Sequence, residues 1–360
     1  GLELGVGVRY DDYSDFGGTT NPKFTIRYTP VEQLLLRASY NTGFSAPTLF
    51  NLNLPNSTTF TANRYNDPLL CPGGVPAPGA IASRDCGIQF QQLQGGNENL
   101  TPEESNAYSL GFVLQPVPSF NFSVDYWHYK IRDSIGVIGE QTIFGDPVQY
   151  ANLFVRCSQA NATQRLLIGA CQNPGAVDPL AFITNTFQNL GETETDGFDF
   201  SANWQGPATR FGRFNVGFRG TYVRNYDFQV VKGGQFFDPV GNYSPQFAGP
   251  VIRLQTVTTL GWNQNAWGAF LTHRFLSGYT DQNAVPAPFN QNRVQDYSIF
   301  DLTGTFTGFR GITLKAGVLN VFDEDPPFTN QVGRFQARGY DDRFHNPLGR
   351  VFVVGASYQF

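Results

Sequence analysis

Apolar and polar residues alternate along most of this chain with a period of two residues. The last ten residues show this clearly: one parity is small or polar, and the other is mostly large and apolar, comprising Phe352, Val354, Ala356, Tyr358 and Phe360. Successive side chains of a β-strand point to opposite faces, so the period predicts a strand with one apolar face.

The same alternation predicts twelve strands. They span residues 2–11, 23–28, 34–41, 105–115, 120–126, 198–204, 214–222, 252–262, 267–275, 300–306, 312–318 and 351–360. Short turns alternate with longer connections, of which residues 44–103 and 133–189 are the longest and show no sustained period. Bacterial outer-membrane barrels have this asymmetry, with short periplasmic turns and long extracellular loops. The pattern therefore predicts an all-β, transmembrane antiparallel β-barrel.

Charged residues near the strand centres share the polar parity. They are Glu3, Arg9, Lys23, Arg27, Arg37, Asp125, Asp199, Arg219, Arg253, Arg274, Asp301 and Lys315. A Lys or Arg on the lipid face at mid-membrane costs about 2–4 kcal/mol, so we expect this parity to face the lumen. Eight of the twelve are basic, which predicts a basic inner wall suited to an acidic internal partner or an anionic solute. A soluble β-sandwich would alternate as well and is the alternative.

Composition narrows the class of protein. Charged residues are 15% of the chain, aromatics are 15%, and no apolar run is long enough for a membrane helix. A net charge of −5 without a basic cluster gives no electrostatic basis for binding nucleic acid. The sequence has no Met and no apolar leader, so we expect a processed chain or part of a longer protein.

The four cysteines fall in the two long loops. Their spacing contains no CxxC motif and no Cys/His metal pattern, so we predict the disulfides Cys71–Cys86 and Cys157–Cys171 in an oxidising compartment. The alternative is four free thiols.

Several stretches resemble the TonB-dependent receptors, gated transporters of the bacterial outer membrane. They read RASYNTGFSAPTLFNL (37–52), NENLTPEESNAYSLGFVLQP (97–116), FNFSVDYWHYKIRDSI (120–135), ETETDGFDFSANW (192–204), LNVFDEDPPF (319–328) and GYDDRFHNPLGRVFVVGASYQF (339–360). The resemblance implies a 22-stranded barrel with a plug domain inside it and a segment that couples to the TonB complex. We expect residues 1–360 to be the C-terminal portion of the barrel domain, with the plug and the N-terminal strands absent. It also implies contact with membrane lipid, and with the barrel assembly machinery through the last strand.

The resemblance places substrate at the extracellular loops and the top of the plug. Candidate loop contacts are Phe44, Phe50, Asn53, Tyr65, Phe154, Arg156, Phe289, Phe328 and Tyr340. Candidate lumen-wall residues are Arg37, Asp125, Arg219, Arg253 and Arg274. Aromatic residues at loop roots also form the interface girdle of a barrel or pack the loops, which is the ordinary alternative for each.

Two other functions compete with active import. One is a self-contained, passive channel of twelve strands, which would explain the strand count. The other is an outer-membrane phospholipase, because His273 and Ser298 share outward parity on neighbouring strands. No group that would orient the histidine is visible, and the three histidines are too scattered for a metal site. We therefore expect a transporter with no cofactor rather than an enzyme.

Overall fold

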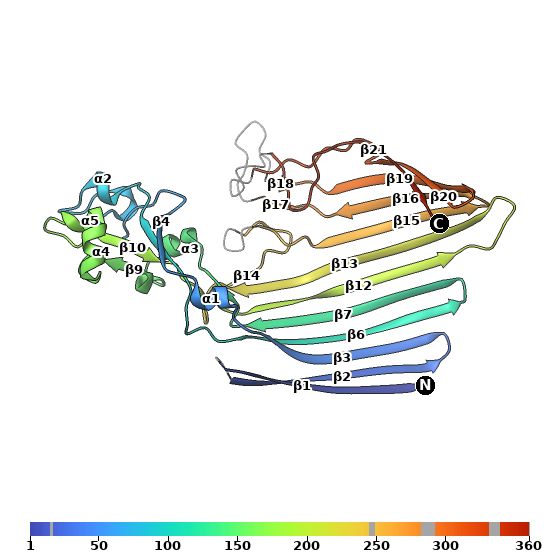
Figure 1. Cartoon of the computed structure of the whole chain (residues 1–360), viewed down its shortest axis with the longest axis horizontal. Coiled ribbons are helices and arrows are strands. Elements are labelled where there is room, and N and C mark those ends of the chain that lie inside the picture. The colour runs from blue at the N-terminus through green and yellow to red at the C-terminus, as the bar shows by residue number, and fades with distance from the viewer. Residues whose placement is uncertain (15–16, 245–248, 282–291, 331–338, 360) are drawn as a thin grey trace.

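Twelve long strands form one antiparallel sheet in the computed structural model, which describes residues 1–14, 17–244, 249–281, 292–330 and 339–359 (Figure 1). The strands are β1 (Leu2–Tyr13), β2 (Gly17–Val31), β3 (Leu34–Ser45), β6 (Glu103–Val117), β7 (Phe120–Arg132), β12 (Thr193–Gln205), β13 (Arg213–Gln229), β15 (Leu254–Gln264), β16 (Trp267–Leu276), β19 (Tyr297–Phe309), β20 (Ile312–Leu319) and β21 (Val351–Tyr358). Each pairs with its neighbours in chain order, and the short strand β14 (Phe236–Phe237) adds to β13. The prediction of twelve strands is confirmed.

The sheet is open within the described residues. β1 pairs only with β2, and β21 pairs only with β20, so the two outer strands do not meet. Both present unpaired backbone groups along one edge, which calls for further strands. Among the described residues, none of the helices is long and apolar enough to cross a bilayer.

Turns and long loops lie at opposite ends of the sheet. In Figure 1 both chain ends and the short turns lie at the right, and the long connections lie at the left. Several strands are longer than the alternation predicted: β2 begins at Gly17 rather than at residue 23, and β13 continues to Gln229. The connections implied between residues 28 and 34 and between residues 115 and 120 are shorter than predicted, because Val31 and Val117 still pair across them. Backbone pairing therefore extends beyond the residues whose side chains alternate between apolar and polar.

The two faces of the sheet differ in chemistry. Leu4, Val6 and Val8 on one parity of β1 are more than 60% exposed, as expected for side chains that face lipid. The opposite face carries rungs of hydroxyl groups, in which Ser39 bonds Ser109 at 2.8 Å and Ser123 bonds Ser201 at 2.9 Å. The polar parity therefore forms the inner face.

The two long loops, residues 46–102 and 133–192, fold together into one unit that we call the loop head. Its four-stranded sheet is ordered β4 (Ser57–Phe60), β5 (Gln91–Gln94), β10 (Leu180–Thr184) and β9 (Phe154–Arg156). A two-stranded ladder joins β8 (Ile135–Gly136) to β11 (Gln188–Asn189). Around these lie α1 (Leu49–Asn53), α2 (Ala82–Asp85), α3 (Glu140–Gly145), α4 (Ala162–Leu167), α5 (Gly169–Gln172) and the 3₁₀ turns η1 (Pro72–Gly74) and η2 (Ala151–Leu153). The sequence showed no period here because the strands are only two to five residues long.

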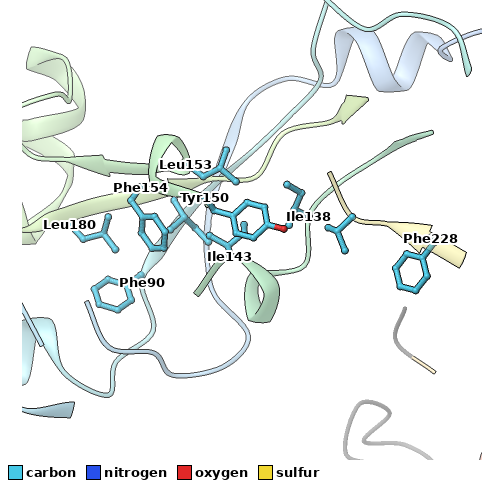
Figure 2. Packing of buried hydrophobic residues seen from close by; sticks show 10 residues of the cluster. Phe90, Ile138, Ile143, Tyr150, Leu153, Phe154, Leu180 and Phe228 are labelled. Atoms are coloured by element: carbon cyan, nitrogen blue, oxygen red, sulfur yellow. The ribbon is translucent and has the colours of Figure 1, made fainter. Parts of the chain in front are cut away.

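A hydrophobic core holds the loop head against the sheet. Figure 2 shows Phe90 from the first loop among Ile143, Tyr150 and Phe154 from the second, while Phe228 at the end of β13 belongs to the same cluster. Both predicted disulfides, Cys71–Cys86 and Cys157–Cys171, are present in this unit. A separate cluster of Ile252, Tyr279 and Val294 holds the later loops, where β17 (Tyr279–Thr280) pairs with β18 (Arg293–Val294).

A buried ion pair joins the two loops of the head. Asp67 is fully buried and accepts two hydrogen bonds from the guanidinium of Arg156, at 2.6 and 2.9 Å. The backbone N–H groups of Leu69, Leu70 and Leu180 also donate to the Asp67 carboxylate. These donors satisfy most of the oxygen lone pairs, which is the condition under which a buried ion pair is tolerated.

Asp67→Ala should therefore loosen the loop head by about 3–5 kcal/mol, because it leaves the buried Arg156 guanidinium without its carboxylate partner. The measurement is hydrogen exchange of residues 46–102 and 133–192 in the full-length protein. Lys232→Ala is the control, since the Lys232 side chain is 81% exposed and its pair with Asp133 contributes little. Unchanged exchange in Asp67→Ala would contradict the assignment.

Candidate functional site

A concave pocket of about 970 Å³ lies on the inner face of the sheet. We call it the lumen pocket. Its charged lining residues are Arg37, Asp125, Asp199, Arg219 and Arg274, which come from five different strands. Hydroxyl groups of Ser109, Ser123, Ser201 and Thr221 lie between them. Four of the five predicted lumen-wall residues thus line one pocket.

Arg37 and Asp125 pair across an intervening strand. The Arg37 guanidinium donates to both Asp125 oxygens, at 2.7 and 2.5 Å. Between them lies β6, where Gly111 is the register partner of both residues. A Cβ at Gly111 would overlap the Asp125 carboxylate, so a glycine here is what lets the ion pair span three strands.

A second ion pair anchors the later loops. Arg274 pairs with Asp301, whose carboxylate also accepts the backbone N–H of Asn320 at 2.8 Å. Asn320 begins the connection that follows β20, so the ion pair fixes where that connection leaves the wall. Arg253, the fifth predicted wall residue, does not line the pocket, because its guanidinium donates to the carbonyls of Arg224 and Val240.

Phe344 is a pocket residue that the sequence reasoning missed. It lines the lumen pocket and packs against the cluster around Tyr279. The turn that carries it is closed by the Asp341 carbonyl, which accepts the backbone N–H groups of Phe344 and His345. Residues 339–350 show no sustained period, so the sequence gives no sign that this segment folds inward.

Two titratable groups shape that turn. Burial alone would raise the pKa of Asp341, but the hydrogen bonds and charge of Arg343 hold it below its usual value. Burial lowers the pKa of His345, whose ring lies edge-on to Tyr297 at 4.9 Å. The Nδ1 atom of His345 is buried without a hydrogen-bond partner among the described residues. The turn is thus built for a neutral imidazole.

Three of the predicted loop contacts are internal to the loop head. Tyr65 stacks on Phe144 with ring centroids 4.2 Å apart, and Phe154 meets the same ring edge-on at 5.2 Å. Burial, followed by the nearby Glu140 carboxylate, raises the pKa of Tyr65 to about 12. Arg156 is the partner of Asp67 described above. These three side chains are brought together by the packing of the head.

The other predicted loop contacts are more accessible. Phe50 on α1 is 60% exposed, and Phe328 is 48% exposed. Asn53 is also exposed, and its amide donates to the Leu49 carbonyl. The Phe44 ring meets the Tyr13 ring at 5.7 Å, and Tyr340 is half-buried. Phe289 lies outside the described residues.

His273 and Ser298 do form a hydrogen bond on the outer face. The His273 Nε2 and Ser298 Oγ atoms are 2.7 Å apart, and the imidazole stacks on Phe300. No carboxylate is a hydrogen-bond partner of this histidine in the described part of the chain, so the pair lacks the third group that a catalytic triad uses. Nor do three His, Cys, Asp or Glu side chains of the described residues gather as metal ligands would.

Comparison with known proteins decides the family. A family model described as TonB dependent receptor-like, beta-barrel matches residues 1–321. The chain belongs to this family. Comparison with curated proteins gave no match. The TonB-dependent receptor barrel is an outer-membrane structure, which places the chain in the bacterial outer membrane.

Solved structures share the fold of this receptor barrel. A ferric enterobactin receptor from Pseudomonas aeruginosa is 16% identical, with a TM-score of 0.65, and a siderophore receptor from Acinetobacter baumannii is 16% identical, with a TM-score of 0.61. An iron transporter from Neisseria meningitidis is 12% identical, with a TM-score of 0.57. Each match covers 100% of this chain and 43% of the other, so the chain spans less than half the length of these proteins.

Gly111→Ala should destabilise the TonB-dependent receptor barrel by about 1–3 kcal/mol, because the added Cβ displaces the Asp125 carboxylate from Arg37. Gly217→Ala is the matched control, since a Cβ at this inner-face glycine would lie 3.6 Å from its nearest neighbour. Thermal unfolding of the detergent-purified protein compares the two variants. Equal melting temperatures would show that the glycine is not required by the ion pair.

Acid should loosen the turn around His345. The pKa of the buried ring is below its ordinary value of 6.5, so its stabilising contribution is present above pH 6.5 and is lost as the pH falls through the folded-state pKa. The nearby Asp341 carboxylate favours protonation and narrows this window. Protection of the amides of residues 339–349, corrected for the intrinsic pH dependence of exchange, should therefore fall in acid, and His345→Gln should abolish that dependence. A loss of protection that persists in His345→Gln would assign it to another group.

Proposed function

We propose that this chain forms the translocating wall of an outer-membrane active-transport receptor. The receptor binds a scarce solute at its extracellular loops and imports it to the periplasm with energy from the TonB complex. Family membership supports this function, and the inner face of the sheet supplies the physical observation that carries it. That face combines hydroxyl rungs with basic side chains, while the outer face is apolar.

The basic charge of the inner face is only partly neutralised. Arg27, Arg37 and Arg274 each have a carboxylate partner. Arg9 has one as well. The other four basic residues near the strand centres pair with no carboxylate among the described residues; they are Lys23, Arg219, Arg253 and Lys315. An acidic occupant would complement this surface.

We infer that the occupant is the plug domain of the full-length protein. The TonB complex would act through the N-terminal part of that protein, membrane lipid would cover the apolar outer face, and the barrel assembly machinery would recognise β21. The open edges of β1 and β21 argue against a channel of twelve strands, because such a channel would have to pair them. An outer-membrane enzyme would need more than the two-residue arrangement of His273 and Ser298.

Uptake by cells that produce the full-length receptor tests the proposal. We expect one solute among ferric siderophores, cobalamin, oligosaccharides and peptides to be taken up only while the proton-motive force is intact. Phe50→Ala should weaken binding of that solute by about tenfold, because Phe50 is the most exposed of the predicted loop aromatics in the described part of the chain. Phe309→Ala, which removes an exposed ring at the opposite end of the sheet, is the control. Uptake that continues after uncoupling would refute active transport.

A further inference from the structure

Two side chains of opposite charge in the lumen pocket have no ionic partner. Three of its five charged lining residues, Arg37, Asp125 and Arg274, belong to ion pairs within the wall. The other two are Arg219 on β13 and Asp199 on β12. In the described part of the chain, neither belongs to an ion pair, and the Asp199 carboxylate accepts one side-chain hydrogen bond, from Thr221 at 2.6 Å.

The strand register places these two charges side by side. Asp199 lies opposite Thr221, and Ser201 lies opposite Arg219, so the charged residues are diagonal neighbours on adjacent strands. Diagonal neighbours have Cα atoms about 7–8 Å apart, which long side chains can bridge. The Arg219 guanidinium nevertheless does not pair with Asp199, and both residues are exposed to the pocket. The wall presents one positive and one negative group with open hydrogen-bonding positions.

The surroundings of the two charges favour a polypeptide occupant. The hydroxyl groups of Ser123 and Ser201 form a rung next to Arg219, and Ser109 and Thr221 also line the pocket. Hydroxyl groups can donate to or accept from a peptide backbone in either direction. The pocket volume of about 970 Å³ is at the upper end of the range for small-molecule sites, and it is much larger than the volume of a single amino acid.

We propose that Arg219 and Asp199 form a bipolar docking point for a polypeptide segment that carries an acidic and a basic side chain close together. The carboxylate of the segment pairs with Arg219, and its ammonium or guanidinium group pairs with Asp199. This inference rests on the proposed function, in which the lumen holds a plug. It adds that the docking segment carries both a positive and a negative group, because an occupant with a single charge would pair with only one of the two residues.

Conductance of the purified full-length receptor in planar bilayers tests the docking point. A seated plug blocks ion flow, so Arg219→Gln and Asp199→Asn should each raise the leak conductance by about tenfold through loss of a charge-assisted contact. The decisive variant is the double exchange Asp199→Arg with Arg219→Asp, which keeps the net charge and reverses the polarity. We expect its leak to be at least as large as that of either single variant, because both contacts become repulsive.

The possible results distinguish failure of the docking point from failure of the proposed function. A double exchange that restores the wild-type conductance would show that the two residues serve each other and would overturn the docking point. Single variants that stay closed but lose binding of a free zwitterion, probed with glycine and lysine, would overturn it in favour of a solute site. A wild-type protein that is itself open would instead refute the plug. Arg210→Gln, at the turn between β12 and β13, is the control, and heat-modifiable migration on gels verifies that each variant is folded.

Discussion

The structure depends on the pairing of backbone N–H and C=O groups between strands. Hydrocarbon offers these groups no alternative partner, so a membrane wall made of strands must continue the ladder from one strand to the next. The same ladder runs past the residues that alternate: β13 remains paired to Gln229 after its alternation has become irregular, and Val31 and Val117 pair beyond the apparent strand ends. The register of this backbone pairing then decides which side chains lie opposite each other.

The ladder also determines how charges meet on the inner face. Residues opposite each other on adjacent strands share a face, so a row of register partners brings together side chains that are far apart in sequence. Arg37 and Asp125 meet in this way only because Gly111 between them has no side chain. Where the row offers no opposite charge, as at Arg219, the group remains available to whatever fills the lumen.

The sequence predicted what depends on local alternation and missed what depends on distant pairing. Twelve strands, their order and both disulfides could be read from period and spacing, because each is a property of neighbouring residues. The sheet of the loop head could not, since its β5–β10 contact joins two separate loops through only two register pairs. For the same reason the position of Arg156 on a long loop suggested a ligand contact, whereas the fold gives it Asp67 as a partner.

Burial divides the predicted loop contacts into two physical groups. Tyr65 and Phe154 pack around Phe144 in the core of the loop head, so replacing them would disturb the head itself, whatever the solute. Phe50 and Phe328 are largely exposed, so their apolar surface is still available to be buried by a ligand. A binding experiment is interpretable only on the second group, because a loss of affinity there cannot be attributed to collapse of the core. The packed core of the head and its few exposed aromatics thus separate the residues that hold the loops from those that can contact a solute.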